Sequence, residues 1–187
     1  MAKLILYRTA LVATAAALLS ACATAPQHPS VSPATLGMGP AGKIPSCGGA
    51  RTDEVLQRVN AARARPQRCS GKMVPAAPAL RWDAALYSAA TGHSQDMASR
   101  NYFDHRSPEG QLVRQRVSSN NYKFRMVGEN LAGGDTSVDE VVQGWLDSPG
   151  HCENMMNPEF ADVAVACVAH PGSTYGTYWT MLLGRSR

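Results

Sequence analysis

Apolar residues recur at helical spacing in three long stretches of this chain. Within each stretch they lie three or four residues apart, as residues on one face of a helix do. We therefore predict helices over 52–65, 83–103 and 137–150. Their apolar positions are Val55, Leu56, Val59 and Ala62; then Leu86, Ala89, Ala90 and Met97; then Val138, Val141, Val142 and Trp145.

The predicted helices carry the residues that usually mark helix ends. Thr52, Asp83 and Ser137 can each accept hydrogen bonds from the free N–H groups of a first turn. Pro66 ends the first helix, and "PG" at 149–150 ends the third. A shorter helix over 112–117 follows the turn-rich sequence "DHRSPEG".

Two segments near the C-terminus have the pattern of strands. "ADVAVACVA" (161–169) consists almost entirely of small or β-branched residues, as expected of a strand covered on both faces. A second strand is predicted over 177–183, and "CSGKMVPAAPAL" (69–80) is predicted to be a loop. Helices followed by strands indicate an α+β layered domain.

The N-terminal segment has a different composition. Residues 1–21 combine a basic start with an apolar run and small residues, which is typical of a signal peptide. "LLSAC" resembles a bacterial lipobox, so Cys22 is predicted to carry a lipid. An uncleaved anchor helix is the alternative, but the apolar run is short for a span of ~20 residues. Ala23 and Thr24, with no Asp after Cys22, resemble an outer-membrane sorting pattern.

Residues 22–50 are rich in Pro, Ala, Ser, Thr and Gly, and are predicted to form a flexible tether. This leaves 51–187 as one domain. Loss of Lys3 and Arg8 with the signal peptide lowers the formal charge by two, from +4 to +2. The sequence has no basic run interleaved with aromatic residues, so we expect no nucleic-acid partner. We expect a monomer.

Four further cysteines indicate an oxidising compartment. Cys47, Cys69, Cys152 and Cys167 are an even number in an exported chain, and none lies in a C-x-x-C motif. Two disulfides are the simplest interpretation. The sequence alone does not choose among three pairings; we favour Cys69–Cys152 with Cys47–Cys167.

Three polar residues stand beside Gly or Pro turns and are the candidates for chemistry. They are His105 in "NYFDHRSPEG", Glu129 in "VGENLAGG" and His151 in "WLDSPGHCENMMNP". Two imidazoles and a carboxylate suit an open zinc shell, and a His–Glu pair suits acid–base work. No nucleophile elbow of the G-x-S-x-G type accompanies them.

Each candidate also has an ordinary structural interpretation. His105 can cap a turn, and His151 can cap a short helix over "CENMMN". Glu129 can pair with Arg106 or Arg125. His93 lies on the buried face of its predicted helix, where a hydrogen-bonded core histidine is at least as common as a ligand.

Five motifs in order carry a resemblance to a known family. "LRW" (80–82), "HSQDMASRNYFDHRSP" (93–108), "GENLAGG" (128–134), "VVQGWLDSPGHCENMMNP" (141–158) and "YWTMLLG" (178–184) resemble the CAP superfamily of SCP domains in its bacterial form. The resemblance covers about 51–185. It implies a three-layer α-β-α sandwich around a central, mostly antiparallel sheet, with an extra strand at 124–134.

The resemblance also implies a cavity lined by two His and two acidic residues. The first His falls on His105 and the first acid on Glu129. The second acid falls on Ser148, and the second His falls on Tyr178, so half of this set is missing. The bacterial "SPGH" sequence supplies His151 instead. We predict that His93 and Asn154 support this cavity.

Three functions follow as hypotheses. The first is an envelope-tethered binding module for a small apolar, peptide or metal ligand, with zinc as the candidate metal. The second is a hydrolase of peptide or cell-wall material in which Glu129 acts with His105 or a metal. The third is a structural or interaction protein with a vestigial cavity.

Overall fold

The computed structural model describes Cys47, residues 52–134 and residues 137–187. All of these belong to one compact unit, Ala41–Arg187. The predicted signal peptide, Cys22 and most of the predicted tether lie outside the described residues. In the part that is described, no helix has the length and apolar character needed to cross a membrane.

The described residues form five helices and six strands. The helices are α1 (Thr52–Arg63), α2 (Ala84–Arg100), α3 (Val113–Ser119), α4 (Val138–Asp147) and α5 (Pro149–Met156). The strands are β1 (Gln67–Cys69), β2 (Lys72–Val74), β3 (Arg81–Trp82), β4 (Phe124–Gly133), β5 (Asp162–Ala169) and β6 (Thr177–Ser186).

Four of the strands form the central sheet, in the order β3-β5-β6-β4. β3 runs parallel to β5, whereas the β5–β6 and β6–β4 pairs are antiparallel. The strand that the resemblance implied at 124–134 is therefore confirmed as β4. It lies at the edge of the sheet, which leaves one side of its backbone open to loops and helices.

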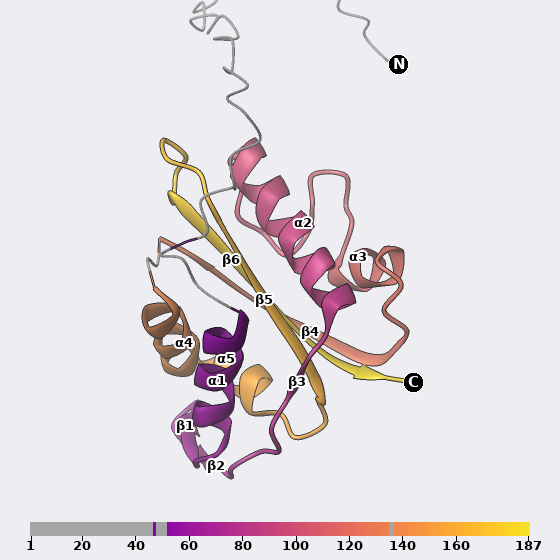
Figure 1. Cartoon of the computed structure of the whole chain (residues 1–187). Coiled ribbons are helices and arrows are strands. Elements are labelled where there is room, and N and C mark those ends of the chain that lie inside the picture. The colour runs from indigo at the N-terminus through magenta and orange to yellow at the C-terminus, as the bar shows by residue number, and fades with distance from the viewer. Residues whose placement is uncertain (1–46, 48–51, 135–136) are drawn as a thin grey trace, which may run out of the picture. The chain divides into compact units, whose positions relative to one another are not determined.

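Helices cover both faces of this sheet (Figure 1). On one face Val163, Val165 and Met181 pack in a cluster with residues of α1, α4 and α5. On the other face Ala164, Ala166 and Leu182 pack with α2 and α3. Successive strand residues point to opposite faces. Neighbouring residues of β5 and β6 therefore pack alternately into one cluster and the other. The three-layer α-β-α sandwich is confirmed.

The predicted helix starts at 83 and 137 are confirmed by their caps. The Asp83 side chain accepts a hydrogen bond from the Leu86 N–H, and Ser137 Oγ accepts one from the Glu140 N–H. α4 ends at Asp147, however, and Pro149 begins a new helix, α5. Proline suits the first position of a helix because its missing N–H would have no partner there.

The segment predicted as a loop at 69–80 contains part of a small hairpin. β1 and β2 pair antiparallel, with Cys69 opposite Lys72. Ser70 and Gly71 both have positive φ, of 52° and 75°, which is the geometry of a two-residue hairpin turn. Gly71 interrupts any regular periodicity in the sequence, yet it is also the residue type that such a hairpin turn favours.

Both favoured disulfides are present in the structure. Cys47 pairs with Cys167 and Cys69 pairs with Cys152, with Cα–Cα distances of 5.8 and 5.4 Å. Cys47 lies within the segment predicted as a tether, yet it is buried and packs in the core beside α1 and α4. The second disulfide joins the β1–β2 hairpin to α5, the helix that carries His151.

Candidate functional site

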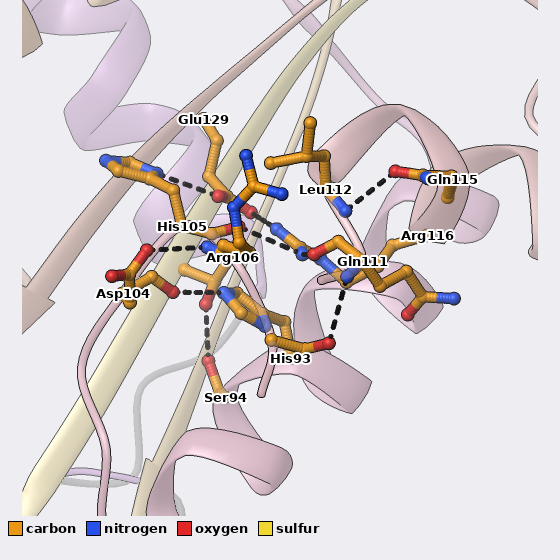
Figure 2. A network of polar contacts seen from close by, with 12 residues as sticks. His93, Ser94, Asp104, His105, Arg106, Gln111, Leu112, Gln115, Arg116 and Glu129 are labelled. Atoms are coloured by element: carbon orange, nitrogen blue, oxygen red, sulfur yellow. Dashed lines mark hydrogen bonds and ion pairs between the residues drawn. The ribbon is translucent and has the colours of Figure 1, made fainter. Parts of the chain in front are cut away.

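Glu129 lies at the centre of a buried polar network (Figure 2). It stands opposite Leu182 in the β4–β6 register, so its side chain points to the face covered by α2 and α3. The side chain is only 3% exposed. Its Oε1 accepts a hydrogen bond from His105 Nδ1 at 2.8 Å, and its Oε2 accepts one from Arg116 Nη2 at 2.6 Å.

Arg116 of α3 is the ion-pair partner of Glu129. Its side chain is 7% exposed, and its Nη1 donates to the carbonyl oxygens of His105 and Gln111. One guanidinium therefore fixes both the carboxylate and the loop that carries His105. The interpretation that Glu129 pairs with an arginine is confirmed, but the partner is Arg116 of helix α3. Arg106, one of the two arginines named as examples, bonds the carbonyl oxygen of Gly110 instead.

An open polar hollow of about 530 Å³ lies beside this network, at the edge strand of the sheet. His105 and Glu129 contribute from one side and residues of α5 from the other. Its lining consists of His105, Glu129, Asn130, Gly150, His151, Glu153, Asn154 and Asn157. The two helical layers of the sandwich thus both reach one site because β4 has no strand on its outer side.

A second set of hydrogen bonds fixes α5 against β4. Asn130 Nδ2 donates to the carbonyl oxygen of His151 at 3.0 Å, and Asn154 Nδ2 donates to Asn130 Oδ1 at 2.8 Å. Gly128 permits this close approach, because an added Cβ would lie 2.5 Å from Asn154 Oδ1 and 2.8 Å from Phe160 Cζ. Close packing at this point therefore explains why a glycine precedes Glu129.

The pKa values of the two imidazoles of the hollow are shifted in opposite directions. The pKa of His105 lies above its usual value, mainly because of the hydrogen bond to Glu129. Burial, and then the nearby charge of His105, lower the pKa of His151. The His105 side chain is 55% exposed, so its Nε2 remains available to the hollow while Nδ1 is held by the carboxylate.

His93 does not line this hollow. It is 1% exposed on α2, and its Nε2 lies 3.1 Å from the carbonyl oxygen of Asp104. Burial lowers the pKa of His93. Since a carbonyl only accepts, Nε2 is the donor, and the bond holds the residue next to His105. The expectation that His93 lies on the buried side is confirmed, and its support of the site is indirect.

The remaining predicted residues divide between the hollow and the core. His151 and Asn154 line the hollow. Tyr178 does not: it is fully buried, packs with Met97 and Leu131, and donates to Asn101 Oδ1. Ser148 is the N-cap residue of α5 and makes no side-chain capping bond. His151, rather than a residue at position 178, thus supplies the second imidazole of the hollow.

The structure adds residues that sequence reasoning missed, chiefly Arg116, Asn130 and Glu153. The sequence predicts a short helix that contains Arg116, but the spacing of Arg116 indicates no partner on a later strand. Asn130 carried a usable signal: once 124–134 is a strand, neighbours Glu129 and Asn130 must point to opposite faces. Glu129 then bonds Arg116 of α3, and Asn130 bonds residues of α5.

His105, Glu129 and His151 do not form a three-ligand zinc shell as they lie. Both oxygens of Glu129 are engaged, one by His105 and the other by the Arg116 cation. In the described part of the chain, no three His, Cys, Asp or Glu side chains gather as metal ligands would. The Arg116 guanidinium supplies the positive charge that a bound cation would supply at the Glu129 carboxylate.

A family model described as "CAP: Cysteine-rich secretory protein family" matches residues 56–183. The chain belongs to this family. The match runs from within α1 through most of β6 and includes every residue of the hollow. The family resemblance seen in the sequence is thus confirmed.

Two of the proteins that this chain resembles are considerably longer than the part that matches. The Bacillus subtilis protein YkwD is 37% identical over 101 residues, which is 54% of this chain and 37% of YkwD. An extracellular SCP-domain protein of Bacillus anthracis has a solved structure with a TM-score of 0.59 and 29% identity, covering 72% of this chain and 40% of that one. This chain therefore spans well under half of either protein.

An outer surface protein of Borrelia burgdorferi shares the fold along nearly its whole length. Its TM-score is 0.57 at 20% identity, and the similarity covers 74% of this chain and 97% of that one. Both solved structures belong to extracellular or surface proteins by their descriptions. The two disulfides of this chain agree with the same kind of compartment.

Proposed function

We propose that this protein is an envelope-tethered binding module whose hollow takes a peptide-type ligand through the ligand's carboxylate or carbonyl oxygens. The observation that carries the proposal is the orientation of His105. A buried, Arg-paired carboxylate holds its Nδ1 at 2.8 Å, so Nε2 is left as a donor to the hollow when the ring is protonated.

The chemistry of the lining supports a polar ligand. Every lining residue is polar or Gly, which disfavours the small apolar ligand considered from the sequence. Gly150 and His151 lie in the first turn of α5, where free N–H groups and the helix dipole favour acceptor oxygens. The raised pKa of His105 adds positive charge at mildly acidic pH.

The tether belongs to the same proposal. A lipid on Cys22 and the linker to residue 50 would hold the domain at the envelope, facing the periplasm from the outer membrane. There, peptide and cell-wall fragments are within reach of the hollow. The extracellular and surface relatives support an extracytoplasmic site of this kind.

Calorimetry on the purified full-length chain tests the binding. Trialanine is titrated against wild type, His105→Gln and His151→Gln, with trialanine amide as a second probe. We expect both variants to weaken binding at least tenfold, and the free acid to bind more tightly at pH 6 than at pH 8. His170→Gln is the matched control, because His170 is exposed on a loop outside the hollow. Equal binding by all four proteins would overturn the proposal.

Hydrolysis is the second candidate, and one observation favours it. An imidazole oriented by a carboxylate through Nδ1, with Nε2 open, is the arrangement of a general base that removes a proton from water. Peptidoglycan and casein are the substrates to test. Glu129→Gln keeps the shape of the side chain but removes the charge that supports the imidazolium. An unchanged rate in Glu129→Gln would rule out this mechanism.

A further inference from the structure

One side of helix α5 forms a wall of the hollow. Residues on one side of a helix recur at spacings of three, four and seven positions. The residues with this spacing that line the hollow are Gly150, Glu153, Asn154 and Asn157. Glu153 is the only acidic residue of α5, and the helix contains no Lys or Arg. It therefore determines the charge of this wall.

The two carboxylates of the hollow differ in their partners. Glu129 is buried, and its two oxygens accept hydrogen bonds from His105 and Arg116. Glu153 is exposed, and its Oε1 accepts a hydrogen bond from Ser70 Oγ at 2.5 Å. A serine hydroxyl brings no charge, and within the part of the chain that the structure describes Glu153 has no cationic partner, unlike Glu129. The negative charge of Glu153 is therefore available to a ligand.

The β1–β2 hairpin holds the Glu153 carboxylate in place. Ser70 follows Cys69 and Glu153 follows Cys152, so their hydrogen bond lies next to the disulfide between the same two segments. Ser70 itself stands in the hairpin turn, with a φ of 52°. Two cross-links at adjacent positions limit the movement of Glu153. A side chain that is already fixed loses less conformational freedom when it binds a ligand.

The hollow has opposite charges on its two sides. On the side of β4, the Glu129 carboxylate is paired with both Arg116 and His105, so this side is positive whenever the His105 ring is protonated. On the side of α5, Glu153 is negative. Charge complementarity favours a ligand with a carboxylate or carbonyl oxygen at one end and a cationic group at the other. A peptide with a free ammonium group has both.

We propose that Glu153 binds a primary ammonium group of the peptide whose oxygens His105 binds. This inference rests on the peptide-binding function proposed above and narrows it to peptides that carry a free ammonium group. The ammonium can donate to Oε2 of Glu153 while Ser70 keeps its bond to Oε1. The same chemistry has two sources: the N-terminal amino group of a short peptide, and the side chain of a lysine-type residue.

Calorimetry on the purified full-length chain at pH 6 tests the ammonium contact. The probes are trialanine, acetyl-trialanine, which has no ammonium group, and acetyl-Ala-Lys-Ala, which has one on its side chain only. Because exposed ion pairs are weak, we expect wild type to bind trialanine about three- to fivefold more tightly than acetyl-trialanine. Acetyl-Ala-Lys-Ala should match trialanine if a side-chain ammonium suffices, and acetyl-trialanine if only the N-terminal group fits.

Three variants separate the charge of Glu153 from its position. Glu153→Gln keeps an oxygen that can accept from Ser70 Oγ, so it should melt as wild type does, but it should abolish the preference for trialanine over acetyl-trialanine. Ser70→Gly tolerates the positive φ and releases the carboxylate, so the preference should fall without vanishing. Glu159→Gln is the matched control and should keep the full preference, because Glu159 is exposed and lies outside the hollow.

Two outcomes would overturn the ammonium contact. One is the same ratio of trialanine to acetyl-trialanine affinity in wild type and Glu153→Gln, which would place the ammonium away from Glu153. The other is an equal loss of preference in Glu159→Gln, which would indicate an effect of net charge alone. Failure of the proposed function is a different result, because His105→Gln would then bind trialanine as tightly as wild type. The absence of trialanine binding by wild type would overturn both.

Discussion

Arg116 and Glu129 form a buried ion pair between helix α3 and strand β4, with Nη2 and Oε2 2.6 Å apart. Their side chains are 7% and 3% exposed. Such a pair is costly to break, because removing one partner leaves an uncompensated charge out of contact with water.

Arg116→Leu should therefore lower the free energy of unfolding by about 3–5 kcal/mol, measured by urea denaturation. Arg125→Leu is the matched control: Arg125 is exposed on the same strand, and its loss should change stability by no more than about 0.5 kcal/mol. The double variant Arg116→Leu with Glu129→Leu should recover part of the loss. A similar loss in the Arg116 and Arg125 variants would contradict the pairing.

Titration of the histidine rings should show two pKa values on opposite sides of about 6.5. His105 should titrate above it because of Glu129, and His151 below it because of burial and the charge of His105. In Glu129→Gln the pKa of His105 should fall, and in His105→Gln the pKa of His151 should rise. NMR of the ring protons measures both, and no change in either variant would sink the assignment.

The same shifts set the pH dependence of folding stability. The pKa of His105 is raised in the folded state, so its contribution is complete below the unfolded value of about 6.5 and is lost as pH rises through the folded value. His151 is shifted the other way and favours folding less as pH falls. The destabilisation caused by His105→Gln should thus shrink between pH 6 and pH 9.

Gly128→Ala should destabilise the domain by about 1–3 kcal/mol, since the new Cβ would lie 2.5 Å from Asn154 Oδ1 and 2.8 Å from Phe160 Cζ. Thermal unfolding measures the loss. Gly150→Ala is the control, because a Cβ there meets no atom within 4 Å and the residue lies in helix α5. If both variants unfold at the wild-type temperature, β4 and α5 are not packed as closely as described.

Removal of the Cys69–Cys152 disulfide should affect ligand binding in the hollow as well as stability. The double Ala variant should lose about 2–5 kcal/mol of unfolding free energy, and α5 with His151 should become less well fixed. Removal of Cys47–Cys167, whose second member is in β5, should cost similar stability but leave peptide binding nearly unchanged. Equal effects of the two removals on calorimetric affinity would contradict this distinction.

Fatty-acid labelling tests the tether. Wild-type protein should carry a lipid and fractionate with membranes, whereas Cys22→Ala should be unlabelled. A label that persists in Cys22→Ala would exclude Cys22 as the modified residue.

The helices and the two C-terminal strands could be predicted because their signals are local. Asp83 and Ser137 cap the first turns that follow them, and the apolar spacing of α4 follows from a single helical face. The hairpin at Ser70–Gly71 and the start of α5 at Pro149 differ from the predicted loop and helix end, because Gly and Pro can either interrupt an element or begin one.

His105, Glu129 and His151 could be selected from the sequence because each stands beside a turn in a distinctive motif, and because together those motifs resemble a family. The sequence by itself determined the layers of the fold, the family and these candidates. Only the tertiary structure decided that Arg116 pairs with Glu129, that Tyr178 belongs to the core, and that His93 lies outside the hollow. The physical reason is that local periodicity specifies which face a residue takes, whereas partners across a sheet depend on the register and packing of elements distant in the chain.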